Sequence, residues 1–343
     1  MKIDRDSARG VLGVILAFAI IGAIDFIKPG VSSAPDYACG SASRAEALID
    51  VGQGESGSSI AEKLFASGVV KSATAFFRVA VSDPTAASIA PGIHRLSKNL
   101  CASQALEQLL DRKRIENLIS IPEGAWKSEV FANLSRIGFR TSEITSASKL
   151  IALPKGFRSL EGLLFPAQYS FDSATPLSTI FANIIERSRI EMERAGFNSS
   201  QEKFSADDLL TIASLVQAEG DTQDFQKISQ VVRNRLKIGM PLQFDSTVHY
   251  IKGSRGSVFL STQSTFINSP YNTYRRTGLP PTPINNPGAK AMYAASHPEP
   301  GAWLYFITVE PGDTRFTDSY QEFSQWKTLY KKNLRAGKFG SKK

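Results

Sequence analysis

An internal repeat constrains the fold of this chain most strongly. When the sequence is displaced by 70 positions, the segment that starts at Leu48 aligns with the segment that starts at Leu118. Each copy predicts a short strand, a glycine turn, an amphipathic helix, a glycine stop and a second helix, so the repeat predicts two small α+β modules in series. The matched positions are apolar or glycine and keep the same order: Leu48 with Leu118, Ile49 with Ile119, Val51 with Ile121, Gly54 with Gly124, Ile60 with Val130, Leu64 with Leu134, and Gly68 with Gly138.

The first copy also contains the pattern G-x-G-x-x-G at Gly52, Gly54 and Gly57, which occurs in dinucleotide-binding folds. Only Gly54 has a glycine counterpart in the second copy. A dinucleotide site needs an acidic residue about 20 positions further on, where residues 73–75 are Ala, Thr and Ala. We therefore expect no nucleotide cofactor at this turn.

An unbroken apolar run of 14 residues, 11–24, follows a basic amino-terminal stretch. Extended to residue 27, with Asp25 as its one charge, it reaches 17 residues, the short end of the roughly 17 to 25 that cross a bilayer. The basic residues before it and the Ser/Ala/Pro-rich segment after it predict a single-pass anchor with its amino terminus inside the cell. A cleaved signal peptide or a buried helix of a soluble protein would give a similar pattern. We expect a cytoplasmic segment at 1–10, a transmembrane helix at 11–27, a linker at 28–44 and an extracytoplasmic remainder.

The length and charge fit an exported protein of about two domains. The chain has 343 residues and a formal net charge of +8, which favours polyanionic partners. Export excludes intracellular nucleic acid and directs this charge toward wall polymer or anionic lipid. The two cysteines, Cys39 and Cys101, are too few for a disulfide scaffold and lack C-x-x-C spacing, and whether they form a single bridge stays open.

One helix places a carboxyl group among aliphatic side chains. Ser205 and Asp208 have the spacing of a capping box, and the run DDLLTIASLVQAEG follows. At 100° per residue, Glu219 shares the face of Leu215 and Val216, whereas Gln217 points elsewhere. Desolvation on that face would raise the pKa of Glu219 toward the range of a general acid. The alternative is that this glutamate, near a helix end, turns back to solvent.

Polar and aromatic residues follow in dense clusters. Tyr271, Asn272, Thr273 and Tyr274 form a polar, aromatic patch ahead of a proline-rich loop, and aromatic faces with amide groups suit a sugar site, although a proline-stiffened structural loop is the alternative. A second polar set precedes it, in which Asp245 is the nearest alternative acid or an N-cap for a helix that begins near Ser246. The members of this second set are Gln243, Asp245, Thr247 and Tyr250.

Other chemistries lack their signatures. His94, His249 and His297 show no metal-ligand spacing, and neither a P-loop nor a nucleophile elbow is present, so we expect no metal and no cofactor. The basic tail, 331–343, is expected to be a solvated and frayed end.

Together these segments resemble the endolytic murein transglycosylases, the YceG-like family. The similar blocks occur in the family's order and cover nearly the whole chain: EGLLFPAQY from Glu161, ASLVQAEG around Glu219, NRLKIGMPLQFDSTVHY, YNTYRRTGLPPTPINNPG and LYFITVEPGDTRF. The resemblance implies an α+β fold with an N-terminal transmembrane helix and a LysM-like α+β module at 45–112. A mixed α+β catalytic region would follow at 113–330, made of the second repeat at 113–175 and a catalytic part at 176–330.

The resemblance also implies an activity and a site. The enzyme would be a lyase at the bacterial cytoplasmic membrane that cuts the MurNAc-β-1,4-GlcNAc bond within peptidoglycan strands, leaves 1,6-anhydro ends and terminates or trims nascent strands. Peptidoglycan synthases would be partners. Glu219 would be the catalytic acid, with Tyr271, Asn272, Thr273 and Tyr274 lining the site and Gln243, Asp245 and Thr247 supporting it.

Two positions depart from the family pattern. Gln217 stands where the family often has the first glutamate of E-x-E, so the catalytic role falls on Glu219 alone. Arg315 stands where histidine is common, which leaves that position without an assigned role. The competing hypothesis is a membrane-anchored protein that binds peptidoglycan without cleaving it, and a scaffold for wall-synthesis proteins is compatible with the enzyme. A binding protein has no need for a carboxyl among apolar side chains, so we favour the enzyme.

Overall fold

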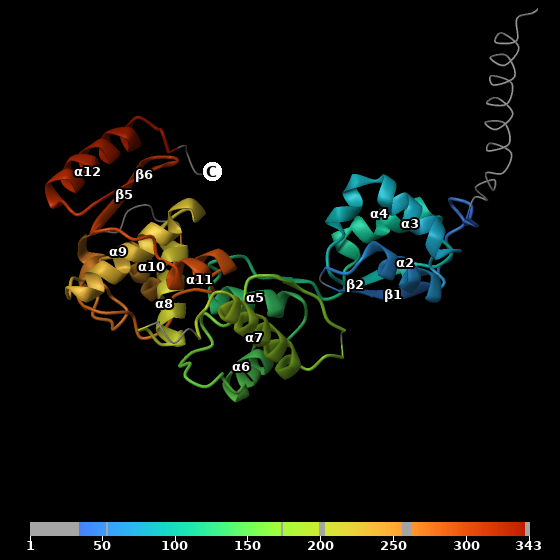
Figure 1. Cartoon of the computed structure of the whole chain (residues 1–343). Coiled ribbons are helices and arrows are strands. Elements are labelled where there is room, and N and C mark those ends of the chain that lie inside the picture. The colour runs from blue at the N-terminus through green and yellow to red at the C-terminus, as the bar shows by residue number, and fades with distance from the viewer. Residues whose placement is uncertain (1–33, 53, 173, 199–202, 256–261, 340–343) are drawn as a thin grey trace, which may run out of the picture. The chain divides into compact units, whose positions relative to one another are not determined.

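The computed structural model describes residues 34–52, 54–172, 174–198, 203–255 and 262–339. The chain divides into two compact units, the first ending at Ile115 and the second beginning at Glu116 (Figure 1). Among the described residues, no helix is both long and apolar enough to cross a bilayer. The predicted transmembrane helix at 11–27 lies outside these residues.

The first unit is built on a two-stranded antiparallel sheet. Strands β1 (Glu46–Val51) and β2 (Gly92–Ser97) pair from Glu46 opposite Ser97 to Val51 opposite Gly92. Because side chains alternate along a strand, Ile49 and Leu96 point into the core, where they join Leu64 and Phe76. The helices are α2 (Gly57–Ala66), α3 (Ala73–Ser82) and the 3-10 turn η1 (Pro84–Ser88) between the strands, then α4 (Ala102–Leu110) and η2 (Arg112–Arg114).

A disulfide bond joins Cys39 to Cys101, the residue before α4. Their Cα atoms are 5.0 Å apart across a sequence separation of 62. Beside the bridge, the Asp36 carboxylate accepts a hydrogen bond from the Ala102 backbone N–H at 3.1 Å. The segment before β1 is thus fastened to the amino end of α4, and the pairing that the sequence left open is present.

The second unit begins with the same order of elements as the first. Strand β3 (Ile119–Ser120) is followed by α5 (Lys127–Arg136) and α6 (Thr141–Leu150), and it pairs antiparallel with β4 (Gln168–Tyr169). Leu64 and its counterpart Leu134 are both fully buried. Gly54 and Gly124 have φ values of +70° and +73°, a left-handed conformation that side chains other than glycine rarely adopt. The paired positions of the repeat therefore share one turn geometry and one core position.

A buried central helix organises the rest of the second unit. Helix α8 (Ala206–Glu219) is packed against α9, α10 and α11, and every residue from Leu209 to Val216 is buried. The expectation of one apolar face was therefore too narrow, because neighbouring helices cover α8 on several sides. The elements around it are α7 (Leu177–Arg194), η3 (Thr222–Asp224), α9 (Phe225–Lys237), α10 (Asp245–Lys252), η4 (Thr262–Phe266) and α11 (Ala289–Ser296).

The carboxyl-terminal part is a hairpin with a helix packed on it. Strands β5 (Tyr305–Glu310) and β6 (Asp313–Thr317) pair antiparallel, and α12 (Tyr320–Arg335) packs against β5 (Figure 1). The prediction of a frayed end from residue 331 was wrong for residues 331–335, which belong to α12. Asn333 is buried and donates a hydrogen bond to the Val309 carbonyl at 2.8 Å, which holds this end of the helix on the hairpin. The fold is α+β, as the sequence predicted.

Candidate active site

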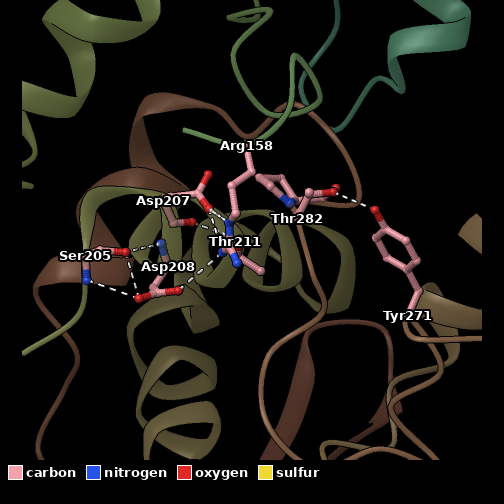
Figure 2. Close-up of polar contacts among 8 residues, drawn as sticks. Arg158, Ser205, Asp207, Asp208, Thr211, Tyr271 and Thr282 are labelled. Atoms are coloured by element: carbon pink, nitrogen blue, oxygen red, sulfur yellow. Dashed lines mark hydrogen bonds and ion pairs between the residues drawn. The ribbon is translucent and has the colours of Figure 1, made fainter. Parts of the chain in front are cut away.

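Helix α8 begins at a complete capping box. Ser205 Oγ accepts a hydrogen bond from the Asp208 N–H at 3.1 Å, and the Asp208 carboxylate accepts one from the Ser205 N–H at 3.2 Å. Figure 2 shows this pair beside Arg158, whose guanidinium forms an ion pair with the buried Asp207 at 2.6 Å. The predicted start of the helix is confirmed, and its first turn is fixed both locally and by a residue from the second repeat.

Glu219 is the last residue of α8, at the end opposite this cap. Its carboxylate accepts a hydrogen bond from the hydroxyl of Ser246 in the first turn of α10. Burial raises the pKa of Glu219 to about 7, the Ser246 hydrogen bond opposes the rise, and the negative charge of Asp245 adds to it. Glu219 stays partly exposed, but its carboxyl is held against Ser246 instead of turning back to solvent, and it can be protonated near neutral pH.

Arg235 is the buried cation of this neighbourhood. It is 7% exposed and donates to the carbonyls of Leu304 at 2.7 Å and Leu242 at 2.6 Å. Its guanidinium also lies 5.4 Å from the centroid of the Tyr305 ring. Its positive charge lowers the pKa of Glu219, but by less than burial raises it.

The polar set at the start of α10 is mostly structural. Thr247 and Thr273 are buried with their hydroxyl oxygens 3.0 Å apart, and Thr273 Oγ1 also accepts from the Phe244 N–H at 2.9 Å. Gln243 is exposed, has a φ of +53°, and donates its N–H to the Thr273 carbonyl at 3.0 Å. These contacts tie the start of α10 to the loop that carries the predicted aromatic patch.

That loop is held from within by Asn272. Its side chain is fully buried, donates to the carbonyls of Thr265 at 3.0 Å and Ile267 at 2.7 Å, and accepts from the Tyr274 N–H at 3.0 Å. The amide is thus used inside the protein rather than presented to a ligand. Asn272, like Thr273 and Thr247, therefore supports the site from inside the protein.

The two tyrosines of the loop are partly exposed. The Tyr274 hydroxyl donates to the Asp245 carboxylate, so the two predicted polar sets meet next to Ser246. Burial, followed by this hydrogen bond, raises the pKa of the Tyr274 phenol. The Tyr271 hydroxyl lies 2.8 Å from that of Thr282 (Figure 2). Asp245 is the first residue of α10, and its carboxylate accepts the hydrogen bond from Tyr274, so it does not serve as the N-cap.

A second buried carboxyl, Glu161, was not singled out from the sequence. It is 3% exposed and accepts from the Lys127 N–H at 2.8 Å and the Tyr250 hydroxyl at 3.2 Å. Burial raises its pKa to about 7. In the sequence, Glu161 comes directly before the apolar residues 162–165. A charged residue next to such a run is the pattern from which its burial could have been predicted.

Asn286 connects Glu161 to the loop after the tyrosines. Its Oδ1 accepts from the N–H groups of Gly162 and Leu164, both at 2.9 Å. Its Nδ2 donates to the Ala125 carbonyl at 2.8 Å and to Glu161 at 3.3 Å. One fully buried amide therefore joins the second repeat to the proline-rich loop.

The two positions that depart from the family pattern have internal partners. The Gln217 side-chain oxygen accepts from the Gly288 N–H at 3.0 Å, just before α11. Arg315 pairs with Asp313 at 2.7 Å and lies 5.9 Å from the Trp326 ring. Within the described part of the chain, no three His, Cys, Asp or Glu side chains are placed to hold a metal ion.

Similarity searches agree on one group of proteins. A protein of Bacillus subtilis (strain 168) named endolytic murein transglycosylase is 32% identical over 304 residues, which covers 82% of this chain and 84% of that protein. A protein of Streptococcus pneumoniae with the same name is 31% identical over 169 residues, 48% of this chain and 31% of its own length.

A solved structure shares the fold. The crystal structure of a YceG-like protein from Listeria monocytogenes superposes with a TM-score of 0.55 at 24% identity, and the match covers 82% of this chain and 99% of that one. The YceG-like family model matches residues 49–328, which include both repeats, α8 and the hairpin. By this match the chain belongs to the YceG-like family.

Proposed function

We propose that this protein is an endolytic peptidoglycan transglycosylase that cleaves the MurNAc-β-1,4-GlcNAc bond within glycan strands. The observation that carries the proposal is the Glu219 carboxyl, which has a pKa raised to about 7 and accepts a hydrogen bond from the Ser246 hydroxyl, next to the Asp245–Tyr274 pair. The names of the two relatives support the substrate and the reaction.

In the first step Glu219 acts as a general acid. Its protonated carboxyl gives a proton to the glycosidic oxygen as the bond from that oxygen to muramic C1 breaks. Ser246 orients the carboxyl, because its hydroxyl donates to one of the two carboxyl oxygens. Asp245 and Tyr274, next to Ser246, would stabilise the positive charge that develops on the sugar ring.

In the second step the same residue acts as a base. The C6 hydroxyl of the muramic residue attacks its own C1, and its proton passes to the Glu219 carboxylate. The product carries a 1,6-anhydro ring, Glu219 returns to its protonated form, and no water is consumed. One carboxyl is sufficient for this reaction, whereas hydrolytic glycosidases usually need two.

The test separates this reaction from hydrolysis and from binding alone. Purified full-length protein would be incubated with glycan strands and the ends identified by mass spectrometry. We expect anhydro ends from the wild type, a loss of at least about 100-fold in Glu219→Gln, and unchanged activity in Glu143→Gln, whose carboxylate pairs with Arg140 on the surface of α6.

Three outcomes would contradict the proposal. If the wild type produced reducing ends in place of anhydro ends, and both Glu219→Gln and Asp245→Asn lost this activity, the enzyme would be a two-carboxyl hydrolase. Undiminished product from Glu219→Gln would remove the assigned acid. Strand binding without cleavage by the wild type would favour the peptidoglycan-binding protein.

The proposal includes an anchored, extracytoplasmic enzyme with residues 11–27 as its membrane span and a LysM-like first unit. The Cys39–Cys101 bridge supports this location, because structural disulfides persist in oxidising compartments. In cells producing the full chain, both cysteines should resist a thiol reagent until reduced, and the protein should stay with membranes in alkaline carbonate. Labelling without reduction, or release by carbonate, would contradict the location. The proposed synthase partners would be sought by pull-down from membranes.

A further inference from the structure

Helix α10 extends the candidate site beyond Glu219. Ser246, which holds the Glu219 carboxyl, and Tyr250 are four residues apart on this helix. Side chains at this spacing lie on one face, one turn or about 6 Å apart. Tyr250 is therefore the next side chain along the surface that starts at the proposed acid.

The Tyr250 ring contacts two other aromatic rings. Its centroid is 5.3 Å from that of Tyr271 and 6.0 Å from that of Trp126, which meets it edge to face at 81°. Its hydroxyl donates to Glu161 at 3.2 Å, so the ring is held at its far end by a buried carboxyl. The side chain nevertheless stays partly exposed.

Trp126 is held from one side in a similar way. The Arg255 guanidinium lies 4.2 Å from the indole centroid. Arg255 is fixed by the Gly124 carbonyl at 2.6 Å and by Glu129 at 2.9 Å. A ring that is partly exposed and already fixed by neighbours can stack on a ligand with little further loss of conformational entropy.

The position of Trp126 is not explained by helix stability. It is the N-cap of α5, where its side chain makes no capping hydrogen bond. The corresponding residue of the first repeat, Ser56, caps α2 by accepting from the Ser59 N–H at 3.2 Å. The second repeat therefore has a large aromatic residue at a position where a serine side chain would cap the helix.

These rings have the chemistry of a sugar-binding surface. Flat aromatic faces cover the apolar C–H face of a pyranose, and a tyrosine hydroxyl at the edge can bond to ring substituents. We propose that Trp126 and Tyr250 form an additional sugar subsite for the ring next along the strand from the bond at Glu219, with Glu161 and Arg255 as positioning residues. The inference rests on the proposed function, and it makes the second repeat, which supplies Trp126 and Glu161, part of the substrate-binding surface.

The binding test uses a full-length variant that is expected not to cleave its substrate. Glu219→Gln would be combined with Trp303→Phe and Trp326→Phe, so that Trp126 is the remaining one of the three tryptophans. Glycan oligosaccharides should produce a saturable change in fluorescence. The matched control carries Trp126→Phe and Trp303→Phe, so that it keeps Trp326, which also lies near an arginine. Its fluorescence should not change when the oligosaccharides are added. An equal response in the control, or no response of Trp126 while calorimetry detects binding, would overturn the subsite.

Further variants test the two rings and their supports. Tyr250→Ala should weaken binding about tenfold, equivalent to about 1.4 kcal/mol, and Tyr250→Phe by less because the ring remains. In the cleaving enzyme, Glu161→Gln and Arg255→Lys should raise KM several-fold with kcat unchanged. Loss of kcat at unchanged KM would contradict a positioning role. Binding by Glu219→Gln can be measured even if the wild type does not cleave, so failure of the proposed function and failure of the subsite are distinguishable.

Discussion

At the scale of the residue, the site depends on one carboxyl whose environment favours its neutral form. Burial raises the pKa of Glu219, and the Asp245 charge acts in the same direction. Arg235, although cationic, directs its hydrogen bonds to backbone carbonyls. The side chain is therefore suited to donate a proton near neutral pH.

The pH dependence of cleavage should follow this carboxyl. Because the acid must be protonated, kcat/KM should be constant below the pKa of Glu219 of about 7 and should fall about tenfold per pH unit above it. The measurement is the initial rate of anhydro-end formation at low substrate concentration across pH 5 to about 9. An inflection near the ordinary glutamate value would contradict the role of Glu219, and Glu143→Gln should leave the profile unchanged.

The same residue should make stability pH-dependent. A carboxyl whose pKa rises on folding from 4.5 to about 7 binds protons more tightly in the folded state. Its contribution to the free energy of folding therefore becomes more unfavourable as pH rises between these two values, and it stays at that unfavourable level at higher pH. Compared with the wild type, Glu219→Gln should therefore gain stability as pH rises from 4.5 to about 7 and keep this gain at higher pH. Urea denaturation at several pH values measures it, and a gain that is independent of pH would contradict the linkage.

At the scale of the element, the site requires the second repeat to stay attached to α8 and the proline-rich loop. Asn286 makes that attachment with four hydrogen bonds, two accepted and two donated. Gly162 lies at the same contact, since a Cβ there would approach Pro283 to 2.6 Å at a φ of +93°. The contact at Gly162 has no room for a larger residue, and the Asn286 side chain supplies the acceptor for its N–H.

Replacement of this amide should be costly. Asn286→Ala leaves the N–H groups of Gly162 and Leu164 buried without their acceptor, so we expect a loss of about 3 kcal/mol in the free energy of unfolding. Asn133→Ala removes two exposed side-chain hydrogen bonds of α5, one donated to the Ser120 carbonyl and one accepted from Arg136, and should cost under about 1 kcal/mol. Equal costs in urea denaturation would show that the Asn286 contacts do not hold the repeat.

At the scale of the whole molecule, the chain has two units with separate cores. The core of the first is centred on Leu64 and Phe76, and the core of the second on α8 and its neighbours. Only the first contains a disulfide. The two units should therefore respond differently to reduction.

Removing the bridge should destabilise the first unit alone. Cys39→Ser with Cys101→Ser opens a loop of 62 residues, for which chain entropy predicts a loss of about 4 kcal/mol. Calorimetry of the full chain should show one transition at lower temperature and the other unchanged. A shift of both transitions would indicate that the units unfold together.

Local patterns were predictable because their physics acts over a few residues. The capping box at Ser205, the carboxyl at the end of α8 and the α+β class follow from periodicity and cap chemistry. The repeat located core positions such as Leu64 and Leu134, since both copies place the same residues inside.

The sequence by itself determined the order of elements in the repeats, where α8 begins and which carboxyl ends it. The tertiary structure alone decided that Asn272 and Thr273 face inward and that Glu161 accepts a hydrogen bond from Tyr250, 89 positions away. It also decided that α8 is covered on several sides, and that Cys39 meets Cys101. The reason is physical: a cap or a periodic face involves neighbours along the chain, whereas burial and long-range hydrogen bonds depend on which elements pack together.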